Sequence, residues 1–216
     1  LEPKRIYRSV KQNIVNNGAT VTYSYMNDGV SCAGEFAGCT ISSLSSFMPA
    51  GAAAAIDAAF AAWSAVADIT FINVADQGEA FNSGTQLSGD IRLGGHAFDG
   101  AFGTLAHGYY PPNNGASAAG DIHFDIAETW KLGFGGTGFD IFQVAAHEIG
   151  HAIGLDHSNT PGSLMNPFYT EAFSGLQADD IAGAQFLYGA KSVPEPMTGA
   201  LILVGLTMFR LRRLSA

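Results

Sequence analysis

The chain has 216 residues, of which 47% are hydrophobic and only 13% are charged, and its formal net charge at pH 7 is −9. This composition excludes a disordered polyelectrolyte and is typical of one folded domain with short appendages. The basic residues gather near the two ends, so that between Gln12 and Ala190 only Arg92 and Lys131 are basic. A body this acidic repels phosphate backbones, which argues against nucleic acid as a partner, whereas bound cations would relieve the repulsion.

Hydrophobic periodicity predicts an α+β fold without internal repeats. Alternation of apolar and polar residues over 20–26 predicts a strand, and apolar residues at helical spacing over 49–67 predict an amphipathic helix with Pro49 in its first turn. Four short strands are expected between Gly-containing loops, at residues 69–74, 90–93, 104–109 and 121–124. A second helix is expected from Asp140, its N-cap, to Gly154, and a third over 177–188.

The two cysteines, Cys32 and Cys39, flank a short loop with the sequence CAGEFAGC. In an exported protein we expect them to pair, which would stabilise the fold by about 2.5 kcal/mol in the chain-entropy description of loop closure. Two buried thiols in a cytosolic protein are the alternative. Residues 1–19 form an N-terminal segment that begins LEPKRIYRSV and lacks the apolar stretch of a secretory signal, so we expect a processed or trimmed start.

The composition changes after Gly189. Residues 190–196 form a linker with the sequence VPEP, and residues 197–216 join an apolar helix, MTGALILVGLTMF, to a basic tail, RLRRLSA. The apolar stretch is shorter than the roughly 20 residues of a relaxed membrane-spanning helix, and its arginines predict a C-terminus on the cytoplasmic side.

This arrangement resembles the PEP-CTERM sorting signal of Gram-negative bacteria. The resemblance implies recognition by an exosortase-type sorting enzyme, contact with the membrane through the C-terminal helix, and export to the cell envelope or the extracellular space. An ordinary tail anchor is the alternative interpretation, and it also requires a membrane.

The segment AAHEIGHAIGLDHS at residues 145–158 carries the most specific pattern. In a helix, His147 and His151 lie one turn apart on one face, so their imidazoles can bind one ion. Glu148 can then reach a water in the open position of that metal, as a general base must. Gly154 allows the chain to leave the helix in a left-handed conformation, so that His157 returns as third ligand. Histidines satisfied on a helix surface or in the core are the alternative, but HExxHxxGxxH arises by chance in such a chain with a probability on the order of 10⁻⁴.

These residues and several other segments resemble the metzincin clan of zinc endopeptidases and, within it, the matrixins, the matrix metalloproteinase family. Met165 in SLMNPFY stands where the Met-turn of the family lies below the metal. Further similarity is found in AIDAAFAAWSAVADITF, FDGAFGTLAHGYYPP, GDIHFDIAETW and LQADDIAGAQFLYG. The resemblance covers about residues 21–189. It implies one catalytic domain over 20–189, with a twisted five-stranded mixed sheet, a first amphipathic helix, an active-site helix and a C-terminal helix.

The resemblance implies an endopeptidase in which His147, His151 and His157 hold a catalytic zinc and Glu148 is the general base. Protein or peptide substrates would lie extended along residues 105–109, in contact with Leu105 and Ala106, and pair through backbone hydrogen bonds. A pocket beside the zinc is expected to accept Leu or Met, lined by Gln143, Pro167 and Tyr169. A surface or extracellular-matrix protein that keeps the metal as a structural staple is the alternative of another class.

The resemblance also implies further metal ions. His107 and His123 match ligands of the structural zinc of the family, and His96 lies in a shortened loop, GGHAFDG, where the family has an HxD pair. Phe98 takes the place of that aspartate, so the identity of the fourth ligand stays open, with Asp99 as one candidate. The alternative to a second zinc site is that these histidines are exposed on strands and bind no metal. Calcium is expected at two groups of acidic loop residues, which are Asp99, Asp125 and Glu128 at one site and Asp90 and Asp121 at another. The alternative is that these carboxylates lie in turns and are solvated.

Overall fold

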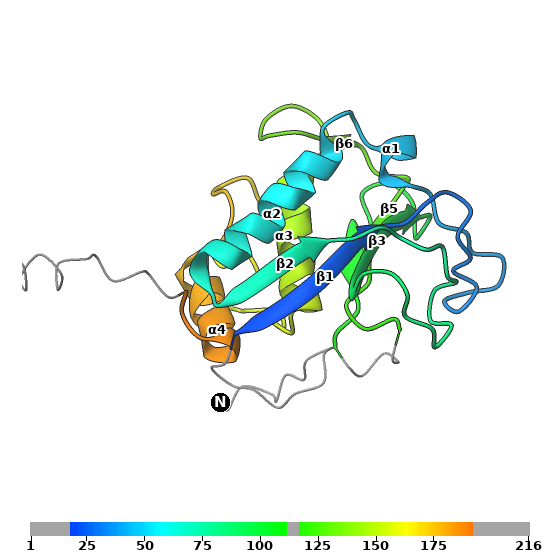
Figure 1. Cartoon of the computed structure of the whole chain (residues 1–216). Helices are drawn as coiled ribbons and strands as arrows, with labels where there is room; N and C mark the ends of the chain where they lie inside the picture. Colours follow the sequence, from blue (N-terminus) through cyan, green and yellow to red (C-terminus); the bar gives the residue numbers. More distant parts are fainter. Residues whose placement is uncertain (1–17, 112–116, 192–216) are drawn as a thin grey trace, which may run out of the picture.

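The computed structural model describes residues 18–111 and 117–191 and has the α+β architecture expected from the sequence (Figure 1). Its main sheet has five strands in the order β2-β1-β3-β5-β4. The strands are β1 (Ala19–Tyr25), β2 (Ile69–Asn73), β3 (Ile91–His96), β4 (Ala106–Gly108) and β5 (Ile122–Asp125). Only β4 runs antiparallel to its neighbour, and it forms one edge of the sheet. The expectation of a five-stranded mixed sheet is therefore confirmed.

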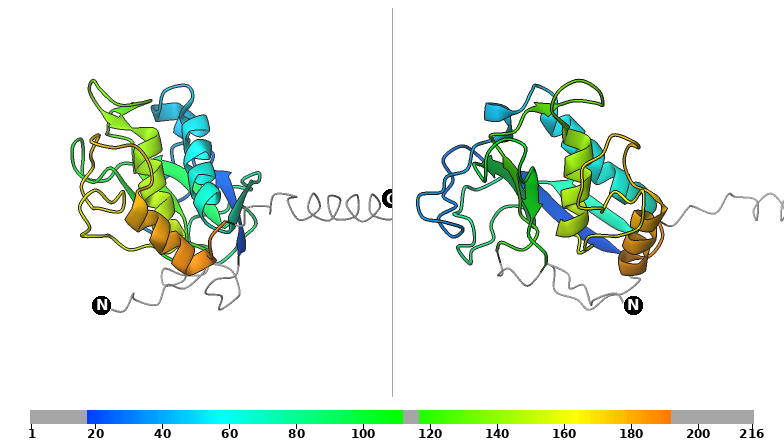
Figure 2. Two further views of the ribbon diagram at one scale, coloured as in Figure 1. Left: turned by 90° about the vertical axis from the view of Figure 1, so that its left-hand side faces the viewer. Right: turned by 180° about the vertical axis from the view of Figure 1, so that it is seen from behind.

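Two long helices pack side by side on one face of this sheet, as the views in Figures 1 and 2 show: α2 (Ala52–Val66) and α3 (Ile141–Ala152). Trp63 in α2 is fully buried and its Nε1 donates to Ala146 O in α3 at 3.0 Å, so one side chain contributes both apolar area and a helix-to-helix hydrogen bond. Helix α4 (Ala178–Tyr188) covers one end of this pair. Its Asp180 completes a capping box with Gln177.

Several boundaries differ from the sequence prediction. Helix α2 starts at Ala52, because Gly51 adopts a left-handed φ of 99° as its N-cap; Pro49 therefore precedes the helix and does not lie in its first turn. The strand expected over 104–109 is reduced to Ala106–Gly108. Three short elements were not predicted: α1 (Leu44–Phe47), β6 (Trp130–Lys131) and β7 (Phe139–Asp140). Elements of two to four residues are too short to show a hydrophobic period.

Cys32 and Cys39 form a disulfide bond, and their loop packs beside the sheet. A small apolar cluster, separate from the main core, surrounds the bond and consists of Met26, Val30, Cys32, Cys39, Ile41, Phe81 and Ala118. The segment that follows the loop approaches β3 closely, since a Cβ on Gly94 would lie 2.5 Å from the side chain of Ile41. No described cysteine is free, so the expected pairing of the two cysteines is confirmed.

The predicted N-terminal segment falls almost entirely outside the described residues, as do the VPEP linker, the apolar helix and the basic tail. Among the helices within 18–111 and 117–191, none has the length and the hydropathy that a membrane crossing requires.

Candidate metal centres

Helix α3 and the turn after it bring together the three histidines of the HExxHxxGxxH segment. The N-cap of the helix is Asp140, whose carboxylate accepts the N–H of Gln143 at 2.9 Å. At its other end Gly154 has a φ of 104°, and the chain reverses so that His157 faces the helix again. The Nε2 atom of His157 lies 3.3 Å from that of His147 and 3.2 Å from that of His151.

The second ring nitrogens determine which way the lone pairs point. Nδ1 of His147 lies 2.7 Å from Leu164 O, and Nδ1 of His151 lies 2.8 Å from Leu155 O. Because a carbonyl only accepts, both Nδ1 atoms carry the proton and both Nε2 atoms present lone pairs to the common centre. Burial lowers the pKa of His147 and lowers that of His151 to about 3, so both rings are neutral at pH 7.

The spacing of these nitrogens fits a tetrahedral zinc ion. Zn–N bonds of about 2.0–2.1 Å at tetrahedral angles would separate two ligand nitrogens by about 3.3 Å. The three atoms also lie close enough together for one ion, and three imidazole ligands leave one tetrahedral position for a water.

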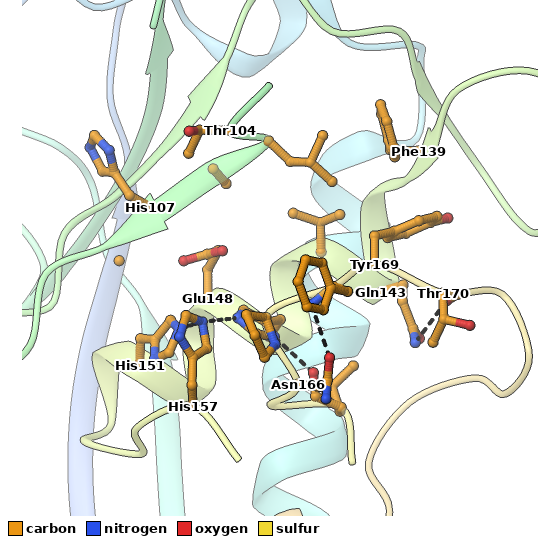
Figure 3. Close-up of a pocket in the computed structure, with 18 of the residues that line it drawn as sticks. Thr104, His107, Phe139, Gln143, Glu148, His151, His157, Asn166, Tyr169 and Thr170 are labelled. Atoms are coloured by element: carbon orange, nitrogen blue, oxygen red, sulfur yellow. Dashed lines mark hydrogen bonds between the residues drawn. The ribbon is translucent and has the colours of Figure 1, made fainter. Parts of the chain in front are cut away.

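Glu148 lies next to this opening, between α3 and the edge strand β4 (Figure 3). Burial raises the pKa of its carboxyl to about 8, and its Oε2 has no hydrogen-bond partner. Gly108 in β4 permits this approach, since a Cβ there would lie 3.3 Å from Oε2 of Glu148 and 3.0 Å from its backbone oxygen. The carboxylate is thus held without a protein donor for one of its oxygens.

A turn below the histidines supports the ring of His147. Asp180 of α4 accepts the N–H groups of Leu164 at 2.8 Å and of Met165 at 3.0 Å, which fixes the carbonyl that holds His147. Met165 is buried directly beneath α3, because a Cβ on Gly150 would lie 2.3 Å from its Sδ. The expected Met-turn therefore packs under the helix that carries His147 and His151.

A cleft of about 700 Å³ runs past the three histidines. It is lined by all five residues expected to contact substrate: Leu105, Ala106, Gln143, Pro167 and Tyr169. The Gln143 side chain bridges to the far wall, donating to Phe173 O at 3.2 Å and accepting from Gly175 N at 2.9 Å. Two exposed aromatic rings stand on the rim, Phe102 with 79% of its surface exposed and Phe168 with 80%.

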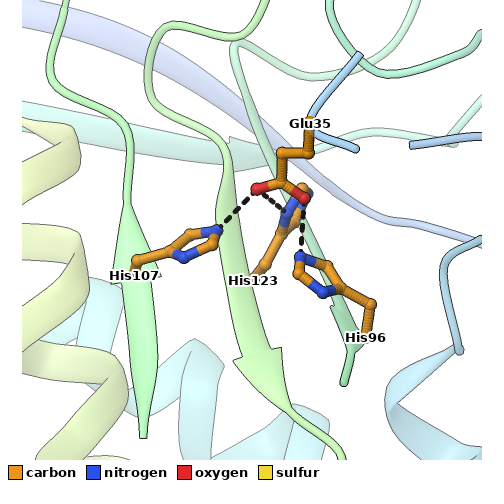
Figure 4. A group of neighbouring side chains, drawn as sticks. All are labelled: Glu35, His96, His107 and His123. Carbon is orange, nitrogen blue, oxygen red and sulfur yellow. Dashed lines mark hydrogen bonds and ion pairs between the residues drawn. The ribbon is translucent and has the colours of Figure 1, made fainter. Parts of the chain in front are cut away.

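The other three histidines form a second cluster, and Glu35 of the disulfide loop joins them (Figure 4). Its Oε2 lies 2.6 Å from His96 Nε2, and its Oε1 lies 2.9 Å from His107 Nε2 and 3.3 Å from His123 Nδ1. The structure thus places Glu35, and not Asp99, in the fourth position. Asp99 turns away to Thr104, whose N–H and hydroxyl it accepts at 3.0 and 2.9 Å.

The electrostatics of this cluster follow from its burial. Burial alone would raise the pKa of Glu35, but contacts with His107, His123 and His96 outweigh that effect and hold this pKa far below its usual value. His123 is completely buried, which lowers its pKa to about 4. The carboxylate of Glu35 is therefore charged at every pH near neutrality, while the imidazole of His123 is uncharged there.

The acidic residues expected to bind calcium divide into two groups. Asp99 and Glu128 flank Gly103, whose N–H donates to Glu128 Oε1 at 3.2 Å, and Asp125 accepts from Phe98 N at 3.4 Å. Oδ2 of Asp125 and Oε2 of Glu128 are buried without partners, as oxygen ligands of a cation would be. In the second pair, Asp90 accepts from Thr22 and Asp121 accepts from Arg92 N, and Oδ2 of Asp121 is likewise buried without a partner. Among the described residues, none of these five acids belongs to a compact group of three metal-ligating side chains.

The sequence of this chain is similar to one protein family and to several known proteins. A family profile described as Matrixin, in the peptidase M10 group, matches residues 39–189. Karilysin of Tannerella forsythia is 42% identical over 143 residues, which cover 62% of this chain and 28% of that protein. Stromelysin-3 of Xenopus laevis is 50% identical over 100 residues, 46% of this chain and 20% of its own length. Interstitial collagenase of Bos taurus is 43% identical over 148 residues, with shares of 67% and 30%. The chain thus spans less than a third of each of these relatives.

Proposed function

The chain belongs to the matrixin family, and on that premise we propose that it is a zinc-dependent endopeptidase that hydrolyses peptide bonds in proteins. The observation that carries the proposal is the convergence of three Nε2 atoms, from His147, His151 and His157, beside the buried carboxyl group of Glu148 in an open cleft. A purely structural metal site does not require a general base next to a vacant coordination position.

His147, His151 and His157 would hold the zinc, which when bound lowers the pKa of its water and polarises the carbonyl of the substrate. Glu148 would take the proton of the attacking water and later deliver it to the leaving amide nitrogen. Its raised pKa suits both roles, because a stronger base accepts the proton more readily and the resulting acid is still strong enough to protonate an amine. A nearby dication would bring this pKa back toward neutrality or below.

The substrate would bind as an added strand on β4, which is the edge of the sheet beside the cleft. Recognition of this kind depends first on the peptide backbone. Specificity would then come from the pocket beside the zinc, where Gln143 and Tyr169 close the wall and Pro167 follows the Met-turn. We propose Leu or Met as the residue after the scissile bond.

Two further features of the proposal concern the setting of the enzyme. The disulfide supports an oxidising compartment, and with the PEP-CTERM-like tail it favours delivery to the envelope or outside of a Gram-negative cell, through an exosortase-type enzyme. The unpartnered oxygens of Asp125 and Glu128 support a calcium ion at the loop that carries Asp99.

The experiment is cleavage of a quenched fluorescent peptide library by the full chain, with and without a zinc chelator, beside the Glu148→Ala variant. We expect cleavage by the untreated protein alone, restored after chelation by added zinc, with Leu or Met dominant after the scissile bond. Equal signals in all arms would favour the non-catalytic surface protein instead, and a profile dominated by Arg or Asp would contradict the proposed pocket.

A further inference from the structure

We propose that the disulfide-closed loop 32–39 supplies Glu35 as the fourth ligand of a second zinc site with His96, His107 and His123, and that the disulfide sets how tightly this site holds its metal. The proposal concerns a different cluster from the cleft and does not depend on peptide hydrolysis.

Neighbouring strands of the sheet place the three histidines together. His107 of β4 pairs directly with His123 of β5, and His96 ends β3, the strand on the other side of β5. Glu35 reaches them from a loop that is remote in sequence, and Figure 4 shows its carboxylate between the three rings. One ligand atom from each of the four residues lies within 4.8 Å of the others, the spacing of ligands around one ion.

Two of the three contacts between Glu35 and the histidines, those of His96 and His107, are not hydrogen bonds, whereas Nδ1 of His123 lies within hydrogen-bond distance of Glu35 Oε1. Nδ1 of His96 lies 3.0 Å from Ala97 O, so Nδ1 carries a proton, and in the neutral ring Nε2 turns a lone pair toward the Glu35 carboxylate. Nε2 of His96 and Nε2 of His107 are both buried and have no hydrogen-bond partner, although each lies within 3 Å of a Glu35 oxygen. Lone pairs that face an anion repel it unless a cation lies between them.

Three imidazole nitrogens and one carboxylate oxygen form a closed tetrahedral set of the kind that structural zinc sites use. Aromatic rings pack against the cluster. Phe98 stacks on His107 with ring centroids 4.5 Å apart, and Phe36 contacts the ring of His96 at 5.5 Å. Phe98 occupies the place where an aspartate ligand was expected, so it adds an apolar wall and leaves the anionic position to Glu35.

The loop holds Glu35 in position before any metal binds. Glu35 N donates to Cys32 O at 2.9 Å, Cys32 N donates to Cys39 O at 3.1 Å, and the disulfide closes the turn. The hydroxyl of Tyr109 also bonds to Glu35 Oε1 and orients the carboxylate. A ligand that is already ordered costs less conformational entropy on binding, so opening the disulfide is expected to weaken the site.

The test uses the full-length His151→Ala chain, in which the cleft has lost a ligand and zinc binding reports the second cluster. Competition with a chromophoric chelator is expected to show one tightly held zinc. Adding Glu35→Gln should weaken its binding at least about tenfold, and adding Cys32→Ser with Cys39→Ser should also weaken it, by a smaller factor. Glu171→Gln, the same chemical change on a partly exposed side chain outside both clusters, should leave the affinity unchanged. Equal zinc affinity with and without Glu35→Gln would overturn the proposal.

A second measurement needs no substitution and so remains decisive if the variants do not fold. Diffraction at the zinc absorption edge from crystals of the unmutated chain should give an anomalous peak within bonding distance of Glu35 and of all three histidines. A peak bound by the histidines while Glu35 points elsewhere, or no peak at this cluster, would overturn the assignment. Either result leaves the peptidase proposal to be judged on its own test.

Discussion

All six histidines of the chain fall into two clusters of three, and the two clusters are built in opposite ways. The first takes two histidines from one helix and a third from the following turn, and its open side faces a cleft. The second takes its histidines from three strands and is closed by a carboxylate from a disulfide loop. The free carboxylate of the first, Glu148, stands beside the ligand set, whereas that of the second, Glu35, stands within it. A domain can therefore place similar ligands in a reactive site and in a closed site by changing only what fills the fourth position.

The largest effect that separates the two clusters is expected for Glu148→Gln. Loss of general acid and base catalysis should lower kcat/KM for a peptide substrate by about 10²–10⁴-fold, while metal analysis shows the same zinc content as the unmutated chain. Steady-state kinetics and elemental analysis of one preparation check both statements. A fall in zinc content of equal size would mean that Glu148 acts as a ligand and would remove the contrast with Glu35.

The buried carboxyl of Glu148 also predicts a pH dependence for the metal-free protein. Its pKa is raised from 4.5 to about 8 by burial, so between these values the folded state keeps a proton that the unfolded chain has lost. The free energy of unfolding of the unmutated protein, measured relative to that of the Glu148→Gln variant, should therefore fall with rising pH in this window by about 1.4 kcal/mol for each pH unit. Urea titrations of both proteins across the window measure the difference. A difference that is constant or grows with pH would contradict the assigned burial.

Asp180→Asn tests the remote support of the first cluster. Its carboxylate fixes the Leu164 carbonyl that orients His147, so the substitution should weaken zinc at this cluster by about tenfold and leave the second cluster unchanged. Asp179→Asn is the matched control, because this adjacent carboxylate is exposed and bonds to Ser158. Equal zinc affinities for the two variants would show that the turn does not position His147.

The smallest effect is expected at the rim of the cleft. Phe168 is 80% exposed, and covering about 40 Å² of its ring by substrate would contribute about 1 kcal/mol, so Phe168→Ala should raise KM by about fivefold. Phe186→Ala removes an exposed ring from α4 outside the cleft and should leave KM unchanged. If both variants behave alike, the aromatic rim has no role in binding.

The same contrast explains what the sequence could predict. The first cluster lies within a segment of fourteen residues, 145–158, and its ligands follow from helical geometry and one glycine, so spacing alone indicated them. The long helices, β1 and β2 were also predictable, because their periods extend over several residues. Glu35 was not, since nothing in CAGEFAGC indicates which distant strands the loop meets. The one available signal was a single acid in an otherwise uncharged loop closed by two cysteines. Phe98 stacks on His107 and Asp99 accepts from Thr104, and no periodicity in the sequence indicates such contacts within a loop.

The most direct test of the central claim asks which cluster admits an outside ligand. The chain is loaded with cobalt(II) in two forms, His123→Ala to leave the first cluster intact and His151→Ala to leave the second, and each visible spectrum is recorded while a small hydroxamate is added. We predict that the spectrum of the His123→Ala protein changes, because three histidines leave a position vacant, and that the spectrum of the His151→Ala protein does not, because Glu35 fills it. A response of both proteins, or a response of the His151→Ala protein alone, would contradict the account.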